Sequence, residues 1–248
     1  MIPRRVIALA GLLALPALAS AQRTTLPPGQ TGPQLPYARW AVTPYIGVRA
    51  PLTTGNEFQY QNGEAVSTHA VSRERGGAVL GGLEAEYRFR RHWSFVGGVA
   101  ASARGNDVLT FSTPSSADTL GADGDRFFFA KAGVSYRLPE PSPDTRRFHP
   151  GGFVTLAPAL VRLDRAGLGK VNNPAVNLGL AATAPLGSSR RLAFQLAVDD
   201  YLTFWDKGKL EAQDAAFYST AAVPVTVHYS YSTSNILVLR LGASFRMP

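Results

Sequence analysis

The tripeptide His228-Tyr229-Ser230 is the part of the chain whose residue types come nearest to a catalytic site. Alternate residues of a strand point to the same face, so a histidine and a serine two positions apart can lie side by side. An imidazole in that position can act as the base that activates the hydroxyl as a nucleophile. Tyrosine and serine are also common in exposed outer loops. We therefore expect an exposed loop here, and keep hydrolysis by His228 and Ser230 as an alternative.

Residues that could hold a metal ion are present but lack the required spacing. Asp118, Asp123 and Asp125 lie in a glycine-containing loop, yet Val134 occupies the position of the closing acidic ligand of a calcium-binding loop. The four histidines show no ligand spacing; they are His69, His92, His149 and His228. The chain has no cysteine, which excludes disulfides, thiolate metal sites and a cysteine nucleophile. We expect Asp118, Asp123 and Asp125 to belong to a solvated loop, and we expect neither a metal nor a cofactor.

The N-terminal residues predict export from the cytoplasm. Arg4 and Arg5 precede an apolar run over 6–19, and Ala19-Ser20-Ala21 is a typical small-residue cleavage site. Residues 1–21 are therefore predicted to be a signal peptide that is cleaved near Ala21. Residues 22–39 are rich in Pro, Thr and Gly and are predicted to form an extended leader. The remaining residues, 40–248, are predicted to form one domain.

Composition excludes several classes of protein. The 248 residues include 24 Gly and 18 Pro, a density of helix breakers that argues against a helix bundle. No later segment is apolar for long enough to form a transmembrane helix. With 25 basic and 17 acidic residues the formal charge is +8. An exported protein rarely meets nucleic acid, so we expect this charge to favour anionic lipid and lipopolysaccharide.

Strict alternation of apolar and polar residues is the dominant pattern after residue 38. In the segment 83–90, Leu83, Ala85, Tyr87 and Phe89 share one face while acidic and basic residues occupy the other. Similar patterns predict eight strands, over 40–49, 79–89, 93–104, 127–138, 151–163, 175–186, 191–204 and 235–246. Most have about ten to thirteen residues, the length that a tilted strand needs to cross a membrane.

The connections between these strands alternate between short and long. Three are compact, at 90–92, 139–150 and 187–190, and four are longer, at about 50–78, 105–126, 164–174 and 205–234. This alternation predicts antiparallel neighbours in an up-and-down barrel, with the long connections at one end. The stretch 215–232 has strand character of its own, and we assign it to an outward β-extension of the last connection.

Charged residues on the polar face of the strands decide between a membrane barrel and a soluble sandwich or lipocalin-like barrel. They alternate with small residues and carry both signs, which suits a narrow interior that must pair its ions. The predicted lumen cluster consists of Glu84, Glu86, Arg88, Lys131, Arg137, Asp199 and Arg240. A structural ion-pair core is the favoured role, and a gate or narrow channel is the alternative, because eight strands enclose little more than their own side chains.

Aromatic residues and arginine pairs mark one end of the predicted barrel. Arg90-Arg91, Arg146-Arg147 and Arg190-Arg191 each stand at a compact connection, where they can face anionic headgroups. Beside them we predict an interface girdle, because amphipathic rings favour the membrane–water boundary. Its members are Trp40, Phe89, Trp93, Tyr136 and Phe245.

These features resemble the small eight-stranded outer-membrane β-barrels, typified by the transmembrane domain of outer membrane protein A. The resemblance covers 40–248 and implies an all-β, eight-stranded antiparallel barrel in the bacterial outer membrane. It also implies that the last strand, ending Leu241-Gly242-Ala243-Ser244-Phe245, is recognised by the outer-membrane assembly machinery. Here Arg246, Met247 and Pro248 follow the aromatic residue on which the family usually ends.

The resemblance says less about activity. The lipid A deacylases, which share this fold, carry a similar His-Tyr-Ser string with an acid downstream, but no Asp or Glu follows Asp214 in this chain. We therefore expect a monomeric, non-enzymatic barrel with a structural or surface-binding role through its four long outer loops. A lipid A deacylase-like hydrolase and a narrow channel are the alternatives.

Overall fold

The computed structural model describes residues 39–62, 65–112, 117–138, 151–186, 191–219 and 224–247. The predicted signal peptide, 1–21, and all of the predicted leader except residue 39 lie outside these residues. Within the part of the chain that is described, no helix is long and apolar enough to cross a membrane.

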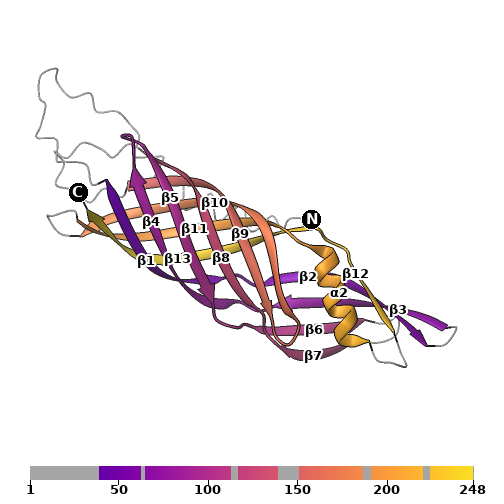
Figure 1. The fold of residues 1–248 in the computed structure, drawn as a ribbon. Helices are drawn as coiled ribbons and strands as arrows, with labels where there is room; N and C mark the ends of the chain where they lie inside the picture. Colours follow the sequence, from indigo (N-terminus) through magenta and orange to yellow (C-terminus); the bar gives the residue numbers. More distant parts are fainter. Residues whose placement is uncertain are drawn as a thin grey trace, which may run out of the picture.

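Among the described residues, eight antiparallel strands close into a barrel (Figure 1). Closure comes from β1, which pairs with β4 on one side and with the last strand, β13, on the other. The prediction of an eight-stranded antiparallel barrel is confirmed. Its strands are β1 (Trp40–Arg49), β4 (Ala78–Arg88), β5 (Trp93–Ser102), β8 (Arg126–Arg137), β9 (Gly151–Arg165), β10 (Gly169–Leu186), β11 (Leu192–Phe204) and β13 (Thr233–Met247).

Each barrel strand buries one face inside the barrel and exposes the other. In β9, Thr155, Ala157 and Val161 are buried, whereas Leu156 and Leu160 point outward and are exposed. This burial follows the period of two in the sequence, which is why the strand positions were predictable. The strands β9 and β10 continue further than expected, to a tight turn in which Gly167 and Gly169 adopt positive φ angles. The predicted long connection at 164–174 is therefore mostly strand.

A second sheet lies beyond one end of the barrel. In the described part of the chain it has five strands in the order β12-β2-β3-β6-β7. Two of the predicted long connections thus hold hairpins that prolong the barrel. Their strands are β2 (Leu52–Asn62), β3 (Ala65–Arg75), β6 (Asn106–Ser112) and β7 (Ala117–Asp123), and β12 spans Val225–Tyr229.

Glycines mark the level at which the hairpins leave the barrel. A Cβ atom on Gly76 would collide with the carbonyl oxygen of Asn106, and one on Gly124 would collide with that of Gly105. The backbones of neighbouring hairpins therefore approach one another at this level more closely than any side chain allows. We call the second sheet together with helix α2 the cap, and the opposite end of the barrel, where β13 finishes at Met247, the C-terminal end.

Helix α2 (Lys207–Tyr218) packs against β12 in the last long connection (Figure 1). The sequence pattern predicted a β-extension at 215–232. The structure confirms a strand in this stretch, since β12 pairs with β2 of the second sheet, but it places the end of α2 at 215–218, where the prediction of strand was wrong. Asp206 caps the helix by accepting a hydrogen bond from the Lys209 backbone N–H at 3.3 Å, and its own N–H donates to Asn173 of β10 at 2.9 Å.

The cap and the adjoining half of the barrel interior share one hydrophobic core. Phe127, Phe129 and Tyr201 point into the barrel, and they belong to the same cluster as Val71 of β3 and Leu210 of α2. All five side chains are buried. The barrel is thus filled by side chains where it meets the cap, and the cap is joined to it by packing as well as by chain connections.

Asp214 joins α2 to two other elements. Its carboxylate accepts a hydrogen bond from Arg165 at the end of β9 at 2.5 Å and another from the hydroxyl of Tyr229 on β12. Next to it, Glu211 accepts from the Tyr229 backbone N–H at 2.9 Å. Burial raises the pKa of Tyr229 above its ordinary value, which keeps the hydroxyl protonated as a donor.

We predict that Tyr229→Phe loosens α2 without opening the barrel. The change leaves one oxygen of a buried carboxylate without its donor, at a cost of about 1–3 kcal/mol. Hydrogen–deuterium exchange should accelerate over 207–218 and stay unchanged in β9 and β10. Tyr231→Phe is the matched control, because the Tyr231 hydroxyl makes no hydrogen bond to any described residue. Equal acceleration in both variants would contradict the role of Asp214 as the anchor.

Candidate functional site

The inward faces of four barrel strands bring oppositely charged residues together at the middle of the barrel. Glu84 comes from β4, Lys131 from β8, Asp199 from β11 and Arg240 from β13. Small neighbours make room for them: Gly179 pairs with Asp199, and a Cβ atom there would lie 2.6 Å from the Asp199 Oδ1 atom.

These four side chains, which we call the central cluster, form a closed ring of ion pairs. Lys131 Nζ lies 3.0 Å from Glu84 Oε2 and 2.9 Å from Asp199 Oδ1. Arg240 completes the ring, with Nη2 at 2.9 Å from Glu84 Oε2 and Nε at 2.5 Å from Asp199 Oδ2. All four residues are buried, and the two positive charges balance the two negative ones.

Neutral groups complete the coordination of the central cluster. The Asn177 side chain donates to Asp199 Oδ1 at 3.3 Å and accepts from Lys131 Nζ at 3.2 Å. The guanidinium of Arg240 lies 4.9 Å from the centre of the Tyr45 ring, where a cation–π contact adds to the ion pairs. Four charges can be buried together inside the barrel only when each of them is paired and hydrogen-bonded. The arrangement favours a structural role.

The other three predicted lumen residues lie nearer the C-terminal end. Arg137 Nη2 donates to both oxygens of Glu86 at 3.1 Å, and Ser94 donates to Glu86 at 2.6 Å. Arg88 lies beside this pair, half-buried. The predicted lumen cluster is therefore divided into two groups along the barrel axis.

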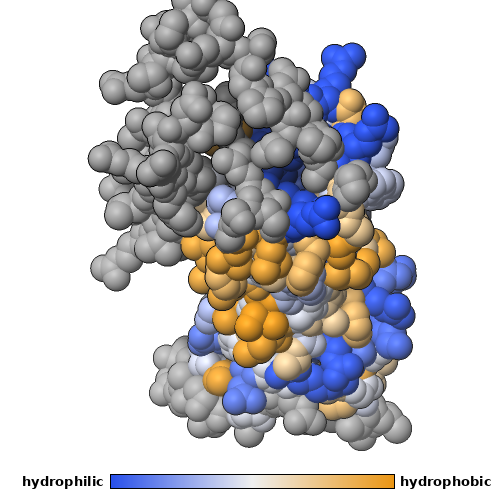
Figure 2. Space-filling view, turned by 90° about the vertical axis from the view of Figure 1, so that its left-hand side faces the viewer, coloured by the Kyte–Doolittle hydropathy of each residue, from blue (hydrophilic) through white to orange (hydrophobic). Residues whose placement is uncertain are grey.

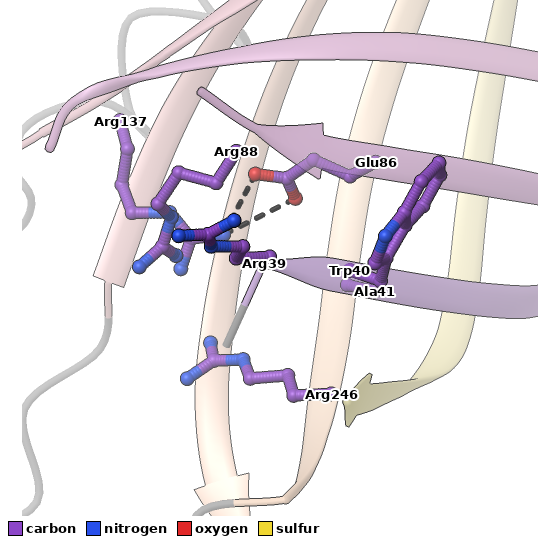
Figure 3. Close-up of a pocket in the computed structure, with 7 residues that line it drawn as sticks. All are labelled: Arg39, Trp40, Ala41, Glu86, Arg88, Arg137 and Arg246. Atoms are coloured by element: carbon purple, nitrogen blue, oxygen red, sulfur yellow. Dashed lines mark hydrogen bonds and ion pairs between the residues drawn. The ribbon is translucent and has the colours of Figure 1, made fainter. Parts of the chain in front are cut away.

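Two arginines that the sequence interpretation did not include join the second group. Among described residues, a small cavity at the C-terminal end is lined by Arg39, Trp40, Ala41, Glu86, Arg88, Arg137 and Arg246 (Figure 3). Arg246 lies six residues after Arg240 on β13, so the two side chains share the inward face, and the alternation already placed Arg246 there. Arg39 precedes β1, where no periodicity could assign it. We call this cavity the arginine mouth.

The five predicted girdle residues surround the C-terminal end from the outside. Trp40, Phe89, Trp93 and Phe245 are each more than 40% exposed, and Tyr136 is half-buried against Trp93, with ring centres 5.1 Å apart. Tyr87, Phe95 and Phe194 also point outward in this region. That these rings lie at a membrane interface remains a prediction.

A third group of buried charges lies where the cap meets the barrel. Arg73 Nη2 contacts Asp107 at 2.8 Å and Asp125 at 3.1 Å, and Arg75 Nε contacts Asp125 at 2.9 Å. Burial, and next the negative charge of Asp125, raise the pKa of Asp107. The expectation that Asp125 belongs to a solvated loop is wrong, because this carboxylate is fully buried between two guanidiniums.

The alternative catalytic residues lie on the cap. His228 and Ser230 are both exposed, on the face of β12 opposite the buried Val227 and Tyr229. In the described part of the chain, His228 donates no hydrogen bond to a carboxylate, and no group of acidic residues and histidines is arranged to hold a metal ion. His92 Nδ1 donates to the Arg137 carbonyl at 3.1 Å. The side chains of Asp118, Asp123, His69 and His149 lie outside the described part.

Comparisons with known proteins find similarity among solved structures. No family model and no curated protein matches the chain. The outer membrane protein OprG from Pseudomonas aeruginosa is 12% identical, with a TM-score of 0.47 over 84% of this chain and 95% of that one. Ail, the attachment invasion locus protein of Yersinia pestis, is 11% identical, with a TM-score of 0.34 over 84% and 98%. Neisserial surface protein A is 10% identical, with a TM-score of 0.38 over 84% and 97%.

We predict that Lys131→Met lowers the free energy of unfolding by about 3–5 kcal/mol, because it leaves a buried negative charge without its partner. Lys131→Met combined with Glu84→Gln should recover part of this loss, since the Asp199–Arg240 pair remains balanced. Urea unfolding in detergent micelles, followed by tryptophan fluorescence, measures both.

The matched control for this prediction is Lys209→Met, which removes an exposed ion pair to Asp206 at 3.1 Å. It should change the free energy of unfolding by less than about 1 kcal/mol. A double variant no more stable than Lys131→Met alone would show that charge balance is not what the central cluster provides.

Proposed function

We propose that this protein is a non-enzymatic barrel of the bacterial outer membrane that holds a folded cap on the cell surface, with a structural or surface-binding role. The observation that carries the proposal is the inverted polarity of the barrel. Its interior holds the ion pairs, while its exterior exposes large apolar side chains on seven of the eight strands; on β8 the outward Phe128, Val134 and Tyr136 are half-buried. Water stabilises neither arrangement, whereas hydrocarbon around the barrel stabilises both.

The apolar exterior has the height of a membrane. On β13 the outward side chains from Leu237 to Phe245 are apolar at every second position. Nine residues of a strand tilted by about 40° rise roughly 20 Å, close to the roughly 25 Å apolar band of outer-membrane barrels. Figure 2 shows this band of hydrophobic residues on the visible face, with hydrophilic residues at both of its edges.

Basic residues outline the two edges of the band. Arg126, Arg162 and Lys170 point outward and are exposed at the cap end, with Asp164 among them. Arg90, Arg91 and Arg191 are exposed at the C-terminal end. Cations at these levels favour anionic lipid headgroups and the phosphates of lipopolysaccharide. The cap is built from the long connections, which outer-membrane barrels carry on the cell surface, so we place the C-terminal end in the periplasm.

The filled interior argues against the alternative of a narrow channel. The central cluster, the buried Phe127 and Phe129 above it and the shared core with the cap occupy the barrel in succession. The hydrolase alternative has no observation in its favour, since His228 and Ser230 are exposed and the imidazole has no described carboxylate to orient it. Recognition of β13 by the assembly machinery and a monomeric state are part of the same proposal.

Cysteine labelling tests the location and orientation together. The chain has no cysteine, so a single introduced thiol reports without background. Gly121→Cys lies on an exposed position of β7 with no atom within 4 Å of the added Cβ, and Arg91→Cys is exposed at the C-terminal end.

We expect a membrane-impermeant maleimide to label Gly121→Cys on intact cells, and to label Arg91→Cys only after the cells are lysed. Both variants should require detergent for extraction. Labelling of both thiols only after lysis would contradict a surface cap, and extraction by salt alone would contradict insertion in a membrane.

A further inference from the structure

The arginine mouth concentrates positive charge at the rim of the barrel. Four of its described lining residues are arginines and only one, Glu86, is acidic. Glu86 is already engaged through both oxygens by Arg137 and by Ser94. Arg39 and Arg88 lie together, because the Arg88 backbone N–H donates to the Arg39 carbonyl at 2.7 Å. Planar guanidiniums gathered in this way are suited to bind a phosphate through paired hydrogen bonds.

An apolar depression lies on the outer face of the same rim. It is lined by Trp40, Ala85, Tyr87, Phe95, Val96 and Gly97. Strand register explains its shape: Trp40, Tyr87 and Phe95 pair in one row across β1, β4 and β5, and Ala85 pairs with Gly97 in the next row. Large rings therefore stand beside a floor of small residues. Trp40 is 48% exposed and Phe95 is 55% exposed.

Packing of the barrel does not require the glycine in this floor. A Cβ atom on Gly97 would meet only the Lys131 carbonyl oxygen, at 3.8 Å, an ordinary contact distance. On Gly133 and Gly242 of the inward face, by contrast, a Cβ atom would lie within 3.0 Å of neighbouring atoms. Gly97 thus leaves open a part of the surface that a larger side chain could fill.

Trp40 joins the two features, since it lines both the arginine mouth and the depression. A ligand that reaches both must carry an anionic group next to an apolar chain. We propose that this rim binds one anionic phospholipid, with its phosphate on Arg39 and Arg88 and an acyl chain over Ala85 and Gly97 between the rings. The inference rests on the proposed function, because phospholipids face this end of the barrel only when the C-terminal end is periplasmic.

Native mass spectrometry of the purified full-length protein in detergent, with added phosphatidylglycerol, tests the site. The double variant Arg39→Gln/Arg88→Gln removes the charge, and Gly97→Leu fills the depression. Each should weaken phosphatidylglycerol binding about tenfold, the effect of losing one charge-assisted or well-packed contact. Ala85→Leu gives a second means of filling the depression should Gly97→Leu fail to fold, which heat-modifiability on gels detects.

Matched controls separate this site from general lipid adhesion. Gly81→Leu adds the same side chain to the outward face of β4, where the Cβ atom would meet only the Tyr45 carbonyl at 3.9 Å. Lys209→Gln removes an exposed cation of α2, which lies outside the mouth and outside both basic edges of the apolar band. Both should bind phosphatidylglycerol as the unchanged protein does. Equal binding by all variants, or an equal loss in Gly81→Leu and Gly97→Leu, would overturn the proposal.

Inorganic phosphate distinguishes a phospholipid site from an anion site. We expect phosphate alone to bind far more weakly than phosphatidylglycerol and to be indifferent to Gly97→Leu. Phosphate that binds as tightly as the lipid would overturn the phospholipid assignment. Because this assay uses detergent-solubilised protein, its failure would leave the cysteine-labelling result intact, and the two proposals fail separately.

Discussion

Charge balance inside a closed sheet is the constraint on which this structure depends. The apolar outer face leaves the barrel no outward position for Lys131, Arg240, Glu84 or Asp199, and all four are buried within it. Their ring of ion pairs makes that burial tolerable, and it draws on four strands that are distant in sequence. Each pair also fixes register, because a shift of one residue would turn a charge onto the apolar outer face. The central cluster therefore selects the closed barrel over other pairings of the same strands.

Buried charges are also paired where the barrel meets the cap. Beyond the central cluster, the interior changes to the apolar side chains of Phe127, Phe129 and Tyr201, and then to the buried pairs of Arg73 and Arg75 with Asp107 and Asp125. Hairpins that leave a barrel with such an interior cannot end in solvated loops without exposing its apolar layer. The second sheet and α2 cover that layer, which explains why the long connections are folded.

An element of this structure could be predicted from the sequence only where its packing imposes a local pattern on the residues. The eight barrel strands were predictable because their outer face is apolar and their inner face largely polar, which gives an alternation such as that of 83–90. The stretch 53–57, Thr-Thr-Gly-Asn-Glu, contains no large apolar residue, so the alternation in β2 is limited to Phe58 and Tyr60 and was too short to predict the strand. Helix α2 depends on tertiary contacts of Leu210 and Asp214 with distant strands, which no local pattern reveals. The alternation along each strand predicted which charged residues point into the barrel. Their division into a central cluster and an arginine mouth could not be predicted, because it depends on how far neighbouring strands are shifted along the barrel axis.

The glycines of this barrel differ in whether packing requires them. Gly133 lies against the backbone of β9, and Gly179 leaves room for Asp199, so both are explained by the interior. Gly97 has the same residue type and the same strand environment but faces outward with space around its missing side chain. A larger apolar side chain at such a position would extend the apolar outer face of the barrel without a clash. Gly81 of β4 is equally open and faces outward, so open space alone does not indicate a site. Gly97 differs from Gly81 because three rings and a cluster of arginines lie beside it, where the proposed acyl chain would occupy the space.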